Sequence, residues 1–358
     1  MTHQQIAVVV SGFPRRSETF ALNELGALAD RGMLAGIYAT KPGDGAQVQP
    51  GCGRLLPFVE ILPGKNDDEQ GAALARRLAA RNVDAIHAYF AHAPAAVAES
   101  ASARLSLRFG FSVHARDARK VDQSTLAARA RRASCVVACN RDVAKDLHDS
   151  GACAHLVPHG VDLERFSPTP ASTSHRLRVL AVGRLVPKKG FDVLIDAVAL
   201  TGGDITLRIV GDGPQRDALL ARIIAHGLTG RVTLVRSCTH TALPAEYSAA
   251  DVVVVPSVID GSGDRDGLPN VVLEAMASGR PVIGTDVGAI GAAVTNGVTG
   301  MLIPSESPTA IARSLEVLAA NVHLRMELGC LARAEAVRRY DLASCVDRFA
   351  RLLEAAYA

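Results

Sequence analysis

Asp266-Gly-Leu-Pro-Asn-Val-Val-Leu-Glu274-Ala-Met-Ala-Ser-Gly279 is the stretch that constrains this chain most. Pro269 is suited to the first helical position and Gly279 to a helix end, so the pattern predicts a short helix from about Asn270 to Ser278. Asp266 then lies on the loop before that helix, and Glu274 projects from its second turn. The sequence therefore predicts two carboxylates on either side of a helix start.

The start of this helix has the chemistry of an anion site. The turn is formed by Gly267, Leu268 and Pro269. The first backbone N–H groups of the helix, at Asn270 and Val271, favour a phosphate. Carboxylates that accept from hydroxyls, next to a helix end that favours phosphate, indicate a nucleotide-sugar site. For this stretch alone, an ordinary amphipathic helix with two solvated acids remains the alternative.

Apolar β-branched runs alternate with helical segments along the whole chain. Continuous apolar runs of this kind are typical of parallel sheets that are covered on both faces. The runs are residues 5–11, 85–90, 109–113, 134–139, 178–182, 206–210, 231–235, 251–256 and 281–285. The pattern predicts an α/β fold of two doubly wound, Rossmann-like domains, with ligands at the carboxyl ends of the strands and a cleft between the domains.

The length of 358 residues fits two domains. The segment 167–175 is rich in Ser, Thr and Pro and is predicted to be a linker. The first domain is then 1–166 and the second 176–340. Residues 341–358 carry apolar side chains at helical spacing, and we expect this helix to pack back on the first domain.

Composition narrows the class of protein. The chain is 48% hydrophobic and 21% charged, as globular proteins are. No apolar run is long enough for a membrane span, and no leader precedes the first strand. The seven Cys are scattered and lack metal-ligand spacing, which favours a reducing, cytoplasmic location. Cys135-x3-Cys139 lies in a predicted strand, and no metal site is predicted.

A second motif follows the first strand of the second half. It reads Gly183-Arg184-Leu-Val-Pro-Lys-Lys189-Gly190. Arg184 offers a fork of donors and Lys189 a point charge, and both can converge on one diphosphate. Such charges stabilise a diphosphate that gains negative charge as a glycosidic bond breaks. A loop with solvated cations is the alternative.

Together these motifs resemble the donor domain of GT-B glycosyltransferases of family four. Gly211-Asp-Gly-Pro214, Pro158-His-Gly-Val-Asp162 and Asn296-Gly-x2-Gly-Met-Leu-Ile-Pro304 add to the likeness, with His159 in place of the usual Asn. Phe13-Pro-x2-Ser-Glu-Thr-Phe20 is similar to the exopolysaccharide-type subgroup. The chain departs from the family at Gly288-Ala-Ile-Gly291, where Gly-x-Ile-Pro-Glu is usual.

The resemblance implies a retaining hexosyltransferase that uses a nucleotide-diphosphate sugar, most commonly of uridine, and no metal or other cofactor. The leaving phosphate would take the acceptor's proton during front-face attack. By the same resemblance Glu274 holds the ribose, Asp266 the sugar hydroxyls, and Arg184 with Lys189 the diphosphate. The further donor-binding residues implied are Gly12, Gly267, Leu268, Pro269, Asn270 and Val271. His114, at the end of a strand, is the implied catalytic histidine.

Weaker predictions concern the acceptor, which the resemblance assigns to the first domain: a small molecule, a glycan or a lipid-linked acceptor. His87 and His92 are possible contacts, although the family's His-x-His has become His87-Ala-Tyr89. Arg15 and Arg16 follow the turn after the first strand and are further candidates. Ser17 has the simpler role of a helix cap.

Residues 101–145 hold ten Lys or Arg and three acids, a local charge of +7. This excess indicates an anionic acceptor or peripheral contact with the inner membrane face, or else a solvated basic surface. Nucleic acid is disfavoured, because the chain has no Trp and few aromatics for stacking.

Other functions are compatible with the same predicted fold. A nucleotide-sugar 2-epimerase is one, and the donor motifs argue against it. A silent sugar-nucleotide-binding protein is another, and the presence of Gly12 and His114 favours an enzyme. A dehydrogenase is poorly supported, because no Gly-x-Gly-x2-Gly follows the first strand.

Overall fold

The computed structural model describes residues 4–15, 18–44, 51–114, 121–170, 176–202 and 204–358. Contacts divide the chain into two compact domains. The first comprises Met1–His159 and Ala343–Ala358, and the second Gly160–Leu342. The C-terminal helix belongs to the first domain.

The domain boundary precedes the predicted linker 167–175, of which 171–175 lies outside the described residues. Phe166 is buried in the second domain, with its ring centroid 5.6 Å from that of Tyr247. Arg280 donates to the carbonyl of Thr169 at 3.3 Å. Residues 160–170 are thus part of the second domain, because the boundary is set by these contacts and not by the Ser/Pro-rich composition.

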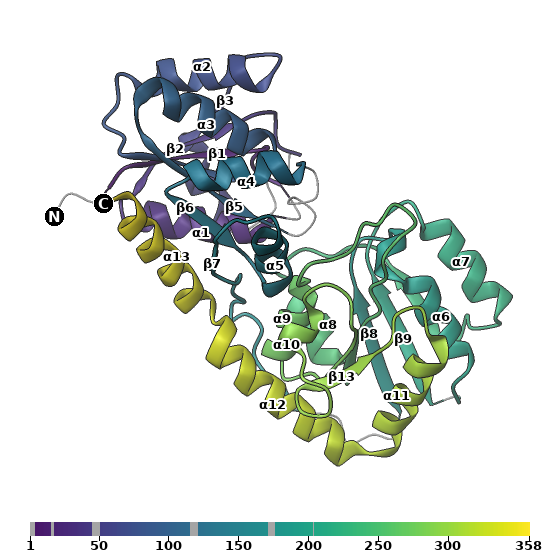
Figure 1. Cartoon of the computed structure of the whole chain (residues 1–358). Helices are drawn as coiled ribbons and strands as arrows, with labels where there is room; N and C mark the ends of the chain where they lie inside the picture. Colours follow the sequence, from purple (N-terminus) through teal and green to yellow (C-terminus); the bar gives the residue numbers. More distant parts are fainter. Residues whose placement is uncertain (1–3, 16–17, 45–50, 115–120, 171–175, 203) are drawn as a thin grey trace. The chain divides into compact units, whose positions relative to one another are not determined.

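The first domain is built on a seven-stranded parallel sheet in the order β3-β2-β1-β4-β5-β6-β7 (Figure 1). The strands are β1 (Ile6–Val10), β2 (Leu34–Ala39), β3 (Val59–Ile61), β4 (Ala85–Tyr89), β5 (Arg108–Val113), β6 (Cys135–Ala138) and β7 (His155–Leu156). Its helices are α1 (Thr19–Asp30), α2 (Asp67–Leu78), α3 (Ala93–Leu105), α4 (Gln123–Arg132), α5 (Arg141–Asp149) and α13 (Leu342–Tyr357).

The second domain has a six-stranded parallel sheet in the order β10-β9-β8-β11-β12-β13. Its strands are β8 (Leu177–Val182), β9 (Ile205–Val210), β10 (Val232–Val235), β11 (Val252–Val255), β12 (Val282–Thr285) and β13 (Gly300–Ile303). Its helices are α6 (Phe191–Ala199), α7 (Arg216–Ala225), α8 (Leu243–Ala249), α9 (Asn270–Ala277), α10 (Ile290–Ala293), α11 (Pro308–Ala320) and α12 (Val322–Tyr340). Both strand orders reverse beside the first strand, so each domain has the doubly wound topology that was predicted.

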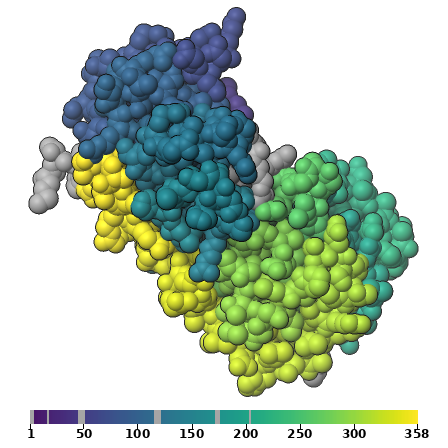
Figure 2. Space-filling model, in the orientation of Figure 1, coloured from purple at the N-terminus to yellow at the C-terminus, as the bar shows by residue number. Residues whose placement is uncertain are grey.

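Each sheet buries both faces, as the continuous apolar runs require. Helix α13 completes the core of the first domain with Phe349, Ala350, Leu353 and Tyr357. Figure 2 shows the last turns of this helix in yellow along the side of the domain. All seven cysteines are free thiols. Among the described residues, none of the helices combines the length and the apolar character that a membrane span requires.

Candidate functional site

In the second domain, the predicted site residues gather where the strand order reverses, between β8 and β11. Asp266 is 8% exposed and lies on the loop that follows β11. Its Oδ2 atom lies 2.7 Å from Lys189 Nζ, on the loop after β8, and accepts from Ser257 Oγ at 2.8 Å. Lys188 Nζ is 3.4 Å from the other carboxylate oxygen. The structure thus brings together the two motifs that the sequence singled out.

These partners keep Asp266 ionised. Burial alone would raise the pKa of the carboxyl group, but the charges of Lys189 and Lys188 and the hydrogen bonds from Lys189 and Ser257 outweigh it. The net result is a pKa below the ordinary value of 3.8. An ionised carboxylate can accept hydrogen bonds from hydroxyl groups at any physiological pH.

Glu274 has a different environment. It projects from the second turn of α9, is 7% exposed, and accepts a hydrogen bond of 2.6 Å from the hydroxyl group of Tyr247. Burial raises the pKa of Glu274 to about 7, although the hydrogen bond from Tyr247 opposes the shift. Sequence reasoning missed Tyr247, because nothing in its spacing from Glu274 signals the contact.

The turn before α9 is supported from a neighbouring loop. Gly288 has a φ of +60°, and a Cβ atom there would lie 2.1 Å from the backbone oxygen of Asp266. The next residue, Ala289, donates from its N–H group to the oxygen of Gly267 at 3.2 Å. The loop that lacks the family's Pro and Glu therefore still fixes the backbone of Asp266.

The other donor residues predicted in the second domain lie in the same two motifs as Lys189 and Asp266. Pro269 precedes α9 with extended backbone angles, and the helix begins at Asn270, as the pattern predicted. Leu268 and Val271 are half-buried and pack against the core beneath the helix. Arg184 is exposed on the loop that follows β8. An exposed guanidinium on this loop is available to an anion.

In the first domain, His114 directly follows β5 and is 7% exposed. Its ring is stacked 5.7 Å from that of Tyr89, and its Nδ1 atom lies 3.1 Å from Nε2 of His159. Burial, together with the neighbouring His159 and His87, holds the pKa of His114 well below its usual range. The imidazole is therefore neutral and able to donate or accept hydrogen bonds.

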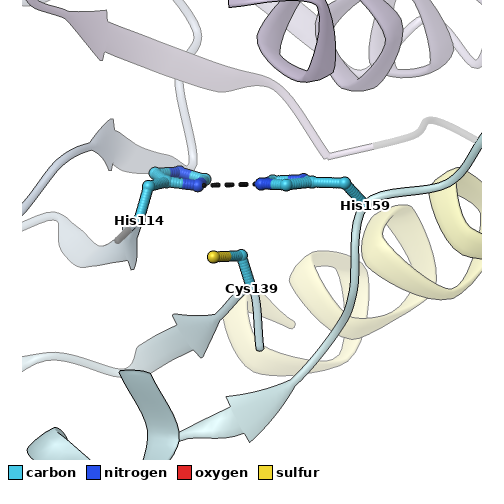
Figure 3. A group of neighbouring side chains, drawn as sticks. All are labelled: His114, Cys139 and His159. Atoms are coloured by element: carbon cyan, nitrogen blue, oxygen red, sulfur yellow. Dashed lines mark hydrogen bonds between the residues drawn. The ribbon is translucent and has the colours of Figure 1, made fainter. Parts of the chain in front are cut away.

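His159, at the position where the family usually carries Asn, links this group to a carboxylate. Its Nδ1 atom lies 3.2 Å from Glu24 Oε1, and Tyr89 donates to the other carboxylate oxygen at 2.7 Å. Burial would lower the pKa of His159, but hydrogen bonds to Cys139 and Glu24 and their charges outweigh it and raise the pKa to about 10. Figure 3 shows the two imidazoles facing each other, with Cys139 beside them.

This cluster of His114, Cys139 and His159 is the feature that sequence analysis overlooked. Their possible ligand atoms all lie within 4.8 Å of one another. The three residues are far apart in the chain, so no motif spacing reveals them. Their positions in the sequence could have indicated the cluster, because each residue follows the end of one of three adjacent strands, β5, β6 and β7.

The acceptor prediction for His87 has to be corrected. The side chain is fully buried in β4, and its two ring nitrogens are bonded to Tyr357 and Ser112 at 2.7 and 2.8 Å. Burial lowers its pKa to about 3. A neutral histidine with both nitrogens engaged inside the core has a structural role, and no ring atom remains for an acceptor.

The remaining predicted residues of this domain are less constrained. A Cβ atom on Gly12 would lie 2.7 Å from the backbone oxygen of Pro42, so internal packing alone explains this glycine. Arg15 pairs with Glu18 at 3.0 Å. His92 is half-buried and stacks on Phe90. Arg16 and Ser17 lie outside the described residues.

Part of the basic charge in 101–145 is neutralised within the domain. Arg129 and Arg132 pair with Glu99, and Arg104 pairs with Asp68. Arg131 and Arg141 are exposed. Arg116, Arg119 and Lys120 fall outside the described residues.

Family models match both domains. The model described as "Glycosyltransferase Family 4" matches residues 17–165, and "Glycosyl transferases group 1" matches 176–321. Among curated relatives, the GDP-mannose-dependent alpha-(1-6)-phosphatidylinositol monomannoside mannosyltransferase of Mycolicibacterium smegmatis is 33% identical over 57% of this chain and 56% of its own length. The putative colanic acid biosynthesis glycosyltransferase WcaL of Escherichia coli is 34% identical over 44% of this chain and 39% of its own.

The chain thus spans about half the length of the curated relatives that it matches. Solved structures extend the likeness of fold over nearly the whole chain. Anabaena Alr3699/HepE in complex with UDP has a TM-score of 0.84 at 21% identity, covering 98% of this chain and 100% of that one. The sucrose-phosphate synthase of Thermosynechococcus elongatus has a TM-score of 0.79 at 22% identity, covering 98% and 99%. These neighbours share the two-domain fold that is known as GT-B.

Proposed function

The chain belongs to the glycosyltransferases of family 4 and group 1, and on that premise we propose that it moves a sugar from a nucleotide-diphosphate donor to an acceptor hydroxyl. The second domain would take the donor and the first the acceptor. One observation carries the proposal: Lys189 and Asp266 meet at 2.7 Å at the strand-order reversal of the second domain. A cation for phosphate and an anion for sugar hydroxyls are adjacent there.

Each residue of the second domain has a role in this proposal. Glu274 accepts hydrogen bonds from the ribose hydroxyls, with Tyr247 holding its carboxylate. Asp266 accepts from the hydroxyls of the transferred sugar. Lys189, Arg184 and the N-terminus of α9 hold the diphosphate, whose charge grows as the bond to the sugar breaks. Electrostatic stabilisation of that leaving group is the main contribution of the protein.

We also propose the chemistry that the family resemblance implies, which is retention without a metal ion. The bond between the anomeric carbon and the β-phosphate oxygen breaks, and a bond to the acceptor oxygen forms on the same face. The acceptor proton passes to the leaving phosphate. His114, buried and neutral, would hydrogen-bond the sugar or the incoming hydroxyl.

The acceptor is proposed to carry phosphate or to lie at an anionic bilayer. The exposed Arg131 and Arg141 of the first domain support this, as members of a basic region that is only partly neutralised. A peripheral position at the inner membrane face would follow. A polysaccharide or glycolipid pathway is the setting that this chemistry fits.

A donor panel tests the proposal directly. Thermal shift with UDP, GDP and ADP sugars should raise the melting temperature for one nucleotide, because a ligand that binds the native state stabilises it. The same donor should then be hydrolysed slowly and show retained anomeric configuration by NMR. If no nucleotide sugar shifts the melting temperature or is turned over, the proposed function is wrong.

A further inference from the structure

We propose that His114, Cys139 and His159 form a binding site for a thiophilic divalent cation, with Zn²⁺ as the ion that fits best. Their ligand atoms lie within 4.8 Å of one another, and all three belong to the first domain (Figure 3). A cation site there goes beyond the proposed glycosyl transfer, for which no metal is invoked.

The sheet explains why these residues meet. β5 pairs with β6 and β6 with β7, all parallel, so their carboxyl ends lie at one edge. Val113 is opposite Ala138 in the register, and the next residue on each strand is a ligand: His114 and Cys139. His159 follows β7 by a few residues. The paired strands therefore fix the positions of His114 and Cys139, and the segment that follows β7 carries His159.

The spacing of the ligand atoms suits a tetrahedral ion. His114 Nδ1 and His159 Nε2 are 3.1 Å apart. Bonds of about 2.0–2.3 Å at a tetrahedral zinc ion place neighbouring ligand atoms roughly 3.3–3.8 Å apart. Small rotations of side chains would bring all three to a common ion. Asn140 Nδ2 lies 3.2 Å from Cys139 Sγ and is placed to stabilise a thiolate.

The surroundings of His159 are those of a metal-binding histidine. Its Nδ1 atom faces Glu24 Oε1 at 3.2 Å, which directs Nε2 toward His114. A carboxylate on the second ring nitrogen is the usual outer partner of a metal-bound imidazole, because it fixes the tautomer and raises basicity. Tyr89 in turn holds Glu24 at 2.7 Å. The position of the Glu24 carboxylate supports a metal-binding role for His159 independently of the distances among the ligand atoms.

The ligand set selects the ion. One sulfur and two imidazole nitrogens favour Zn²⁺ over Mg²⁺, Ca²⁺ or Mn²⁺, which prefer oxygen. His114 and Cys139 are each 7% exposed, so the thiol is withdrawn from solvent while the imidazole of His159 reaches the surface side of the cluster. Three protein ligands leave a fourth position for water or another small ligand.

One consequence rests on the proposed function. His114 is the imidazole assigned to the sugar and acceptor, and an ion on its Nδ1 atom would fix the ring and add a positive charge. Zinc should therefore lower transfer, and a chelator should restore it. Zinc binding itself can be measured without any donor or acceptor, so its failure is distinguishable from a failure of the transferase proposal.

The test starts from a chain without a histidine tag in which Cys153 and Cys330, both exposed, are changed to Ser. After chelator treatment and gel filtration with equimolar Zn²⁺, bound zinc is counted by mass spectrometry, and Co²⁺ binding is followed by thiolate-to-cobalt absorption. One ion per chain and a thiolate band are expected. Cys139→Ser and His159→Asn should abolish both, and Glu24→Gln should weaken binding by about 10–100-fold.

Cys52→Ser is the matched control, since Cys52 is a buried thiol of the same domain outside the cluster. It should retain zinc and the cobalt band. His159→Asn restores the residue usual in the family, so it keeps the test decisive if Cys139→Ser does not fold. Zinc that fails to remain with the parent chain, or remains equally with both cluster variants, overturns the site. Turnover that rises with zinc overturns the inhibitory consequence.

Discussion

Lys189 and Asp266 come from two different strand-end loops of the second domain, and Lys189 Nζ lies 2.7 Å from Asp266 Oδ2. Each side chain is about one-seventh exposed or less, at 15% and 9%. Because the pair is largely withdrawn from water, each charge depends on the other. A ligand with a phosphate for the lysine and hydroxyls for the carboxylate would satisfy both at once.

Lys189→Ala should depress turnover more than donor binding, because the charge that it faces grows during bond breaking. Loss of one such contact typically costs on the order of 100-fold or more in turnover. Lys188→Ala is the matched control, since Lys188 also lies 3.4 Å from Asp266. An equal loss for both variants, or a Lys189→Ala change in the Michaelis constant alone, would remove Lys189 from the mechanism.

Asp266→Asn and Glu274→Gln should separate the sugar from the nucleotide. With nucleoside diphosphate alone, Asp266→Asn should bind as tightly as the parent or tighter, because Lys189 loses its competing carboxylate. Glu274→Gln should lose about 1–3 kcal/mol, since ribose hydroxyls lose a charged acceptor. Binding should be measured by calorimetry at pH 8, where Glu274 of the parent is ionised because its pKa is about 7. Equal losses in both variants would contradict the assignment.

The sequence was sufficient for the fold because burial of both sheet faces leaves continuous apolar runs, such as Ile6–Val10 and Val252–Val255. It also placed Asp266 and Glu274 on the correct sides of a helix start. Those features depend on residues close together in the chain, where local preferences and periodicity suffice.

Contacts between residues that are far apart in the chain could not be predicted from the sequence. Tyr247 reaches Glu274 because α8 packs against the core. His87 is unavailable to a ligand because its Nδ1 atom is hydrogen-bonded to Tyr357, 270 residues away in the chain. The His114, Cys139 and His159 cluster depends on the register of three strands. In each case tertiary packing, and not the residue type, decides the role.

Glu274 should make the stability of the protein depend on pH. Its pKa of about 7 lies above the ordinary 4.5, so the folded state holds the proton more tightly than the unfolded state. The resulting stabilisation is full below about pH 4.5 and is lost as the pH rises through about 7. At about 1.4 kcal/mol per pKa unit, the cost at high pH is on the order of 3 kcal/mol.

Glu274→Gln removes this titration. Denaturant unfolding at pH 5 and pH 8 should show the variant gaining stability relative to the parent as the pH rises. Glu316→Gln, an exposed glutamate on α11, should follow the parent. A constant difference between Glu274→Gln and the parent across this range would show that the glutamate does not titrate there.

The basic surface should respond to salt. Screening over a Debye length of about 8–10 Å weakens surface ionic contacts at physiological ionic strength. Arg131→Glu with Arg141→Glu should reduce binding to phosphatidylglycerol vesicles, or raise the acceptor Michaelis constant, and flatten the dependence on salt. Arg313→Glu, exposed in the second domain, is the control. Vesicle binding and Michaelis constants that are both indifferent to salt would leave 101–145 as a solvated surface.

Gly288→Ala should impair the site through the backbone of Asp266. The new Cβ atom would lie 2.1 Å from the Asp266 oxygen, at a φ of +60°. Gly297→Ala is matched in backbone angle, with a φ of +73°, but no atom lies within 4 Å of its Cβ position. Both variants should lose about 1–2 kcal/mol of stability to the left-handed backbone. Only Gly288→Ala should also lose transfer, because the clash must displace the Asp266 loop from Lys189. Unfolding curves and turnover measured on the same samples separate strain from displacement, and a parallel loss of turnover in both variants would refute the support assigned to Gly288.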